Sequence, residues 1–243
     1  MSQSISRREA QLIDEIKDRE MLFFQPKDVQ RFLDISDRAS YNMVSRMKNK
    51  DLVESIESGK YVLKEILDSR DVYELASNIV DYSYLGFFSA LHFHDLTEQV
   101  PQKVQVAVTK RKDNLRLQGR EIQFIKIDKD HFFGYSKYGN TVASTPEKTV
   151  IDSLRLPGKT GDLSNILDLN YTQFDTELLV DYAVKTGSST VASRLGLILE
   201  KKGIDFNTER LVDMITHYTS LDSQKPDENP VNKWKIYENC GMI

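Results

Sequence analysis

Residues 36–63 read SDRASYNMVSRMKNKDLVESIESGKYVL, and the first half of this segment predicts a helix. Ser36 is a favourable N-cap residue, and Asp37 follows in the first turn, where a carboxylate interacts well with the helix dipole. The apolar residues recur at helical spacing and predict the buried face: Ala39, Met43, Val44 and Met47. The other side chains are mostly short and polar or cationic, so we expect them to face outward.

The second half of the segment predicts a β-hairpin. Residues 52–56 and 60–63 are strand-like, and Glu57-Ser58-Gly59 supplies a turn in which glycine can adopt a positive φ. A helix followed so closely by a small hairpin is typical of a winged-helix domain, in which the helix enters the DNA major groove and the hairpin lies along the neighbouring backbone.

Two further helices are expected before this segment. Ser6 and Glu9 have the spacing of a capping box, which predicts the start of the first helix. Pro26 fits the first turn of the second helix, which should end near Asp34. The short loop before Ser36 then indicates a helix-turn-helix, so we predict a winged-helix domain at residues 1–68.

The outward face of the predicted third helix suits DNA recognition, because arginine can bind guanine bidentately and asparagine can bind adenine. Lys60, beside the hairpin turn, is expected to contact a phosphate and so to position the domain. The predicted DNA-binding residues are Arg38, Ser40, Tyr41, Asn42, Ser45, Arg46, Asn49, Lys50 and Lys60. A solvated helix face, or a winged helix used for protein contacts, is the alternative interpretation.

Composition bounds these expectations. The chain has 243 residues, enough for a small domain plus a larger one, and a net charge of −4. The first 67 residues carry 12 lysines and arginines against 12 aspartates and glutamates, so DNA binding would depend on a polarised face and on salt. No apolar segment approaches the roughly 20 residues of a membrane span, and the start has no apolar core of a secretion signal, so we expect a cytoplasmic protein. Cys240, the only cysteine, can form neither an internal disulfide nor a zinc site.

The rest of the chain predicts an α+β protein, with a larger mixed α/β domain at residues 69–243. Its sheet is expected at about 80–155, a helical part at about 160–220, and a polar, extended tail at 222–243. The predicted strands include two that alternate clearly, joined by a loop at 110–120, and two shorter ones: residues 103–109, 121–127, 132–134 and 141–143.

Three segments of this part have a distinctive order: FFSALHFHDLTEQVPQKVQVAVTKRK, then FFG, then VASTPEKTVIDSL. Together they resemble the AbiEi family, the antitoxins of AbiE-type (type IV) toxin–antitoxin pairs, over roughly residues 10 to 155. The positions that match the family pattern are Ser89-Ala90-Leu91, Leu96-Thr97, Pro101, Thr109, Pro146-Glu147-Lys148-Thr149 and Asp152. Asp95 departs from it, because the family often has glycine there, and the local turn is expected to differ.

The resemblance implies a transcriptional autorepressor that binds inverted repeats in double-stranded DNA at its own promoter. It also implies a nucleotidyltransferase-like toxin as functional partner, countered without a stable complex, in phage abortive infection. On this interpretation the protein is a monomer in solution, two copies occupy the operator, and no cofactor is needed.

A second basic patch fits a DNA-binding protein. Residues 103–126 contain seven lysines and arginines against two acidic residues. We expect additional phosphate contacts from part of this patch: Lys110, Arg111, Lys112, Arg116 and Arg120. A solvated hairpin loop is the alternative.

Enzymatic functions find little support in the residues. His92 and His94 of HFHD are about 200° apart on a helix, so they cannot both face one metal, and we predict no metal site. Glu147 and Lys148 could suggest a nuclease pair, but a helix start already explains them. No P-loop, G-x-S-x-G or dinucleotide motif is present. A winged-helix regulator with a ligand-sensing C-terminal domain and, less favoured, a DNA-targeted nuclease-like enzyme remain as alternatives.

Overall fold

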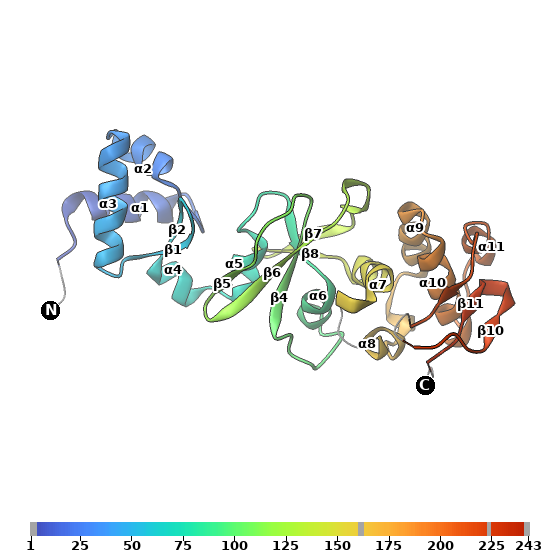
Figure 1. Ribbon diagram of the computed structural model, residues 1–243. Coiled ribbons are helices and arrows are strands. Elements are labelled where there is room, and N and C mark those ends of the chain that lie inside the picture. Colours follow the sequence, from blue (N-terminus) through green and yellow to red (C-terminus); the bar gives the residue numbers. More distant parts are fainter. Residues whose placement is uncertain (1–3, 160–162, 223–224, 241–243) are drawn as a thin grey trace.

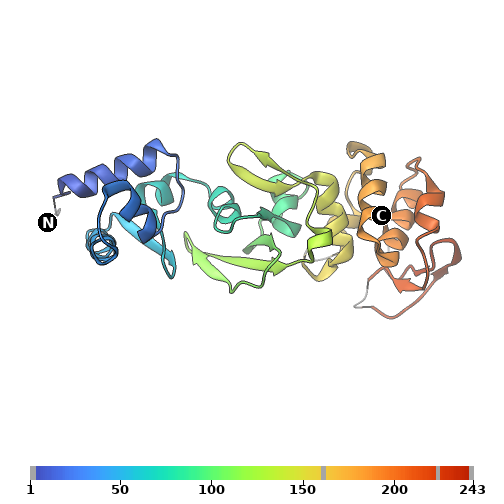
Figure 2. The same ribbon diagram turned by 90° about the horizontal axis from the view of Figure 1, so that it is seen from above.

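The computed structural model describes residues 4–159, 163–222 and 225–240. The elements follow one another along an elongated molecule, with an N-terminal helical unit at one end, a sheet in the middle and a mainly helical unit at the other end (Figure 1). The view from above shows the same order (Figure 2). The protein is a mixed α+β structure with small sheets, as the sequence predicts.

The N-terminal unit has three helices and a hairpin at the predicted positions: α1 (Arg7–Asp18), α2 (Pro26–Leu33), α3 (Asp37–Asn49), β1 (Val53–Glu57) and β2 (Lys60–Leu63). Ser6 and Glu9 form the expected capping box on α1, and the Ser36 side chain accepts a hydrogen bond from the Ala39 N–H at the start of α3. Phe24 adds a bridge beside the hairpin, exchanging two 2.9 Å backbone hydrogen bonds with Tyr61. The starts of α1 and α3 thus follow from signals that lie within a few residues of each other.

The middle unit is a six-stranded sheet in the order β5-β6-β4-β3-β8-β7. Its strands are β3 (Ser83–Leu85), β4 (Lys103–Val108), β5 (Leu115–Leu117), β6 (Arg120–Lys126), β7 (Tyr135–Tyr138) and β8 (Thr141–Ser144). The sheet is mixed, because β4 pairs with β6 and β3 with β8 in parallel, while the other pairs are antiparallel.

Two strand predictions in this unit are wrong. The segment 110–120, expected to be a loop, contains β5, because Leu115 and Leu117 alternate and pair with β6 across a two-residue turn at Gln118-Gly119. Both turn residues have a positive φ, which matches the right-handed twist of a tight hairpin. The strand expected at 132–134 lies instead at Tyr135–Tyr138, after a short 3-10 helix, η1 (Lys129–His131).

One apolar cluster joins the N-terminal unit to the sheet. Ile56, Val62 and Leu67 are buried together with sheet residues such as Leu117 and Val106. The chain crosses between the units through α4 (Lys64–Ser69) and α5 (Val72–Ser77). The predicted domain boundary at residue 68 therefore lies inside a shared core, and the N-terminal unit is docked on the sheet rather than tethered to it.

The C-terminal unit packs helices against the far side of the sheet. Its helices are α6 (Phe87–Phe93), α7 (Pro146–Arg155), α8 (Ser164–Leu167), α9 (Thr176–Thr186), α10 (Ser189–Lys201) and α11 (Thr208–Val212), with 3-10 turns η2 (Pro157–Lys159) and η3 (Tyr171–Gln173). Leu154, Ile166, Leu179 and Leu195 belong to its single large core. No helix within the described ranges is both long and apolar enough to cross a membrane.

The expected extended tail is wrong for the residues that can be described. Its strands β10 (Pro230–Val231) and β11 (Ile236–Tyr237) form a small sheet with β9 (Thr219–Ser220), which precedes the tail, and η4 (Asn232–Trp234) lies between β10 and β11. Trp234 is fully buried against Gly196, where an added Cβ would lie 2.1 Å from the indole ring. The segment is mostly polar, so its composition does not indicate that Trp234 is buried in the core. Residues 223–224 and 241–243 of the predicted tail lie outside the described residues.

Candidate nucleic-acid interface

One face of α3 is open to solvent along the whole helix. Met43, Val44 and Met47 are buried in the N-terminal core, which fixes the rotation of the helix. Six of the predicted side chains therefore face outward: Arg38, Tyr41, Asn42, Ser45, Arg46 and Asn49. Tyr41 is 51% exposed. In the described parts of the chain, neither the Arg38 nor the Arg46 side chain has a hydrogen bond, an ion pair or a ring contact, so both guanidinium groups are free for a ligand.

Ser40 does not belong to this face, and its predicted DNA contact is wrong. It is fully buried, and its hydroxyl donates to the Asp37 carbonyl oxygen at 2.7 Å. The Gln30 amide of α2 lies 3.4 Å from the same hydroxyl, so Ser40 helps to hold α2 against α3. The reason is periodicity: Ser40 precedes Met43 and Val44 by three and four residues and so shares their stripe.

Lys50 is also unavailable to DNA. Its ammonium lies 2.7 Å from Glu9 Oε2 and 3.0 Å from the Ser4 carbonyl oxygen, so it ties the end of α3 to the start of α1. Glu9 is almost completely buried. Burial opposes its ionisation, but hydrogen bonds from Lys50 and Ser6 outweigh burial and hold the pKa of Glu9 below its usual value.

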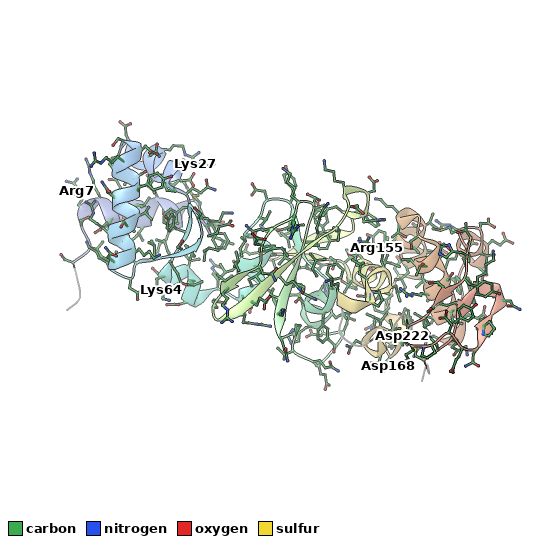
Figure 3. All side chains as sticks on the ribbon, viewed as in Figure 1. Arg7, Lys27, Lys64, Arg155, Asp168 and Asp222 are labelled. Atoms are coloured by element: carbon green, nitrogen blue, oxygen red, sulfur yellow. The ribbon has the colours of Figure 1, made fainter. Side chains whose placement is uncertain are left out.

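This tie brings a basic pair that the sequence interpretation missed to the end of α3. Arg7 and Arg8 begin α1 directly after Ser6, and both are exposed without a partner in the described residues. Figure 3 shows Arg7 beside α3. The sequence does contain a signal for this arrangement. Arg7 and Arg8 stand next to Glu9, and a buried glutamate requires a cation from elsewhere in the chain, which here is Lys50. Lys48 of α3 is exposed as well, so the N-terminal unit carries three further exposed cations besides Arg38 and Arg46.

The hairpin lysine turns toward the protein instead of outward. The Lys60 ammonium donates a hydrogen bond to the Ile79 carbonyl oxygen and lies 3.6 Å from Glu57 Oε1, and only 19% of the side chain is exposed. The predicted phosphate contact of Lys60 is therefore wrong. The physical reason is the shared core, because Ile56 and Val62 draw the hairpin onto the sheet and leave Lys60 beside the backbone of residue 79.

Two members of the second basic patch are likewise occupied, which corrects their predicted roles. Lys112 forms an ion pair with Glu57 at the end of the hairpin and lies 5.2 Å from the centre of the Phe124 ring. Arg120 donates to the Pro101 carbonyl oxygen and lies 5.6 Å from the centre of the Tyr73 ring. Both cations hold segments of the protein together.

The other three predicted phosphate contacts, Lys110, Arg111 and Arg116, are exposed. Lys110 and Arg111 lack side-chain partners among the described residues, whereas Arg116 lies opposite Glu121 in the β5–β6 pair. With Lys103, which pairs with Glu121, the charge of Arg116 lowers the pKa of Glu121. Lys110 and Arg111 border a cavity of about 550 Å³ whose other walls come from the hairpin end and from residues 79–82. This cavity lies where the hairpin of the N-terminal unit meets the sheet. Lys110 and Arg111 are therefore held at a fixed position relative to the N-terminal unit.

The residues that suggested enzymatic sites have other partners. His92 Nδ1 lies 3.1 Å from the Tyr73 hydroxyl, whereas His94 Nε2 lies 2.6 Å from the Ser144 carbonyl oxygen. Burial lowers the pKa of His94. Glu147 accepts a hydrogen bond from the Asp175 N–H, while Lys148 is buried and pairs with Asp152, so the two neighbours do not form a carboxylate–lysine site. Among the residues that the structure describes, no three histidine, cysteine or acidic side chains are arranged to hold a metal ion.

Comparison with known proteins adds a fold relationship. No protein-family model matches the chain, and no curated protein sequence matches it. Among solved structures, the chain is similar to the crystal structure of the RV2827C protein from Mycobacterium tuberculosis. The TM-score is 0.62 at 12% identity, and the match covers 96% of this chain and 92% of that chain. At this identity the similarity concerns the fold alone: nearly the whole arrangement described above recurs in a solved protein.

Proposed function

We propose that the protein binds double-stranded DNA through a winged helix, with α3 as the recognition helix. The observation that carries this proposal is the unobstructed outer face of α3. Arg38, Asn42, Arg46 and Asn49 recur at three- and four-residue spacing on that face and carry the donors and acceptors that read base edges. A purely structural helix would gain nothing from leaving two guanidinium groups without partners on one surface.

The backbone contacts of this proposal differ from those that the sequence suggests. Lys60 and Lys112 fix the hairpin to the sheet, so the phosphate contacts pass to other exposed cations: Arg7, Arg8, Lys48, Lys110, Arg111 and Arg116. Such contacts release counterions, and affinity should fall steeply as salt rises.

We further propose that the protein is an AbiEi-like antitoxin and autorepressor in the cytoplasm. Two monomers would occupy inverted repeats at the promoter of its own operon, and the functional partner would be a nucleotidyltransferase-like toxin countered without a stable complex. The basis is the ordered set of motifs. One structural detail supports it: Asp95, where the family often has glycine and where we expected the turn to differ, has φ +56°, so the backbone there keeps a conformation that glycine adopts without strain.

Binding of the full chain to its own promoter region tests the DNA proposal. Fluorescence anisotropy should show tighter binding to this duplex than to a scrambled duplex of equal length, with a linear loss of log affinity against log salt. Equal affinity for both duplexes, or no binding at low salt, would overturn sequence-specific recognition.

The antitoxin proposal has a separate test. Co-expression with the product of the adjacent gene should restore growth that this product alone inhibits, while the two proteins migrate separately in size-exclusion chromatography. Absence of a nucleotidyltransferase-like neighbour, or no rescue of growth, would contradict it and leave the DNA-binding proposal standing.

A further inference from the structure

A second charged cluster lies on α7, on the opposite side of the sheet from α3. Lys148, Asp152 and Arg155 are four and three residues apart and share one face of this helix. Lys148 and Asp152 are fully buried and form an ion pair. The Tyr84 hydroxyl donates to the second Asp152 oxygen at 3.0 Å. The carboxylate is therefore already satisfied by two partners.

Arg155 is left over in this arrangement. Its Nε lies 4.0 Å from Asp152 Oδ1, too far for a hydrogen bond. Nε and Nη2 are both buried and have no hydrogen-bond partner in the described chain. The exposed 15% of the side chain does not include these two nitrogens, so a ligand reaches them only when the side chains that cover them shift. Buried donors without acceptors are costly, and a guanidinium offers five of them in a fixed plane.

His131, from η1, adds a second unsatisfied group. Its Nδ1 is buried without a hydrogen-bond partner in the described chain. Burial, together with the charges of Arg155 and Lys148, lowers the pKa of His131, while Asp128 and Asp152 act in the opposite direction. Lys185 of α9 and Lys148 lie 4.3 Å and 4.6 Å from the centre of the same Phe133 ring. Three cations, Lys148, Arg155 and Lys185, thus lie near one another in this part of the protein.

An aromatic surface borders the same cluster. Tyr135 stacks on Tyr84 with ring centres 5.2 Å apart and an interplanar angle of 14°, and Phe132 lies within 5.1 Å of both rings. Tyr135 is 37% exposed. The hydroxyl of Tyr84 reaches Asp152, so the open ring of Tyr135 is linked to the charged cluster through a single side chain.

We propose that this cluster is a binding site for a phosphate group, which Arg155 would grip with its unpaired nitrogens while His131 Nδ1 contributes a further hydrogen bond. A phosphate offers several acceptor oxygens and negative charge, and it matches the planar fork of arginine. It would satisfy the buried donors. The ligand class is a small phosphate-bearing molecule, independent of DNA binding at α3.

Calorimetric titration of the full-length chain with pyrophosphate at constant ionic strength tests the site. Removing a charge-assisted contact in Arg155→Met should weaken binding by about tenfold or more. Arg210→Met is the matched control, because Arg210 is a surface arginine on α11 that pairs with Asp181 at 2.7 Å. It should bind like the wild type. No binding of millimolar pyrophosphate to the wild type, or equal binding to Arg155→Met, would overturn the proposal.

Hydrogen exchange on the wild type keeps the test independent of how the variant folds. Pyrophosphate should slow exchange in peptides that cover α7 and residues 129–133, and no slowing there would refute the site. ATP supplies the same phosphate chemistry plus a ring that can stack on Tyr135. Tighter binding of ATP than of pyrophosphate would identify the ligand as a nucleotide. Equal binding of the two would identify it as a free phosphate or pyrophosphate.

Discussion

Helices α3 and α7 have similar sequence patterns, but the basic residues of α3 are exposed and Lys148 of α7 is buried in an ion pair. Both begin at a side-chain N-cap and carry basic residues along one face. On α3, Arg38 and Arg46 face water. On α7, Lys148 is completely buried and is held by Asp152. The comparison teaches that a cation which stabilises the fold has little left for a ligand, whereas an exposed cation contributes almost nothing to stability and is free to bind.

The largest difference should appear when the buried pair is broken. Lys148→Met removes the cation that pairs with the buried Asp152 and leaves Arg155 at 4.0 Å, too far for a hydrogen bond, so we expect the free energy of unfolding to fall by about 3–5 kcal/mol. Denaturant unfolding followed by the fluorescence of Trp234, the single tryptophan, would measure it.

A double variant makes this prediction sharper. Lys148→Met combined with Asp152→Leu removes both charges and should recover much of the lost stability, because buried ion pairs are often replaceable by apolar side chains. A single variant as stable as the wild type would show that the pair is not buried as described.

On α3 the expected effect is on binding instead. Arg46→Ala should lower affinity for the promoter duplex by ~1–3 kcal/mol and relax preference at one base pair, if the guanidinium binds guanine bidentately. Stability should change by no more than about 0.5 kcal/mol, as for other surface substitutions. Anisotropy on a set of single-base operator variants, with a parallel unfolding curve, separates the two quantities. An equal loss on scrambled DNA would make Arg46 a phosphate contact.

The Glu9–Lys50 ion pair is intermediate in burial between the exposed arginines of α3 and the fully buried pair of α7. The pH dependence of stability tests this pair. The pKa of Glu9 is lower in the folded protein than its usual value of 4.5, so its ionised form stabilises the fold at neutral pH. That contribution is lost as pH falls through the folded pKa. Glu9→Gln should therefore be less stable than the wild type at neutral pH, and the difference should narrow in acid below 4.5. Unfolding curves across this range that run parallel would contradict the pair.

The smallest expected effect concerns the free cations of the β4–β5 loop. Lys110→Ala should reduce the salt slope of DNA binding by about one, with similar loss for all sequences. Stability should not change, because Lys110 has no partner in the described structure. An unchanged salt slope would remove this loop from the DNA surface.

Local sequence signals predict the N-terminal unit well. Ser6 with Glu9, Ser36, and the turn at Ser58-Gly59 act within a few residues, and each element begins where they indicate. The same periodicity, applied to every residue and not only to apolar ones, would also have placed Ser40 in the core. We predicted that Ser40 faces outward because its side chain is polar, but its hydroxyl donates a hydrogen bond to the Asp37 carbonyl oxygen and can therefore be buried.

Contacts between distant segments could not be predicted in this way. Lys60 finds its acceptor 19 residues away, and Lys112 pairs with Glu57 across 55 residues. Trp234 packs on Gly196 from a segment that is mostly polar. Each of these depends on how separate elements dock, and a pattern read within one element carries no such information. The same limit explains why the α7 cluster stays invisible until η1 and β3 are placed beside it.

The apolar cluster shared by the hairpin and the sheet restricts how the N-terminal unit can move relative to the rest of the protein. If the N-terminal unit binds DNA as proposed, it cannot rotate toward its half-site without pulling Ile56, Val62 and Leu67 out of the core that they share with the sheet. The rest of the protein would therefore have to follow the N-terminal unit around the duplex. Inserting about five base pairs, half a helical turn, between inverted repeats would carry the second body to the opposite side of the double helix.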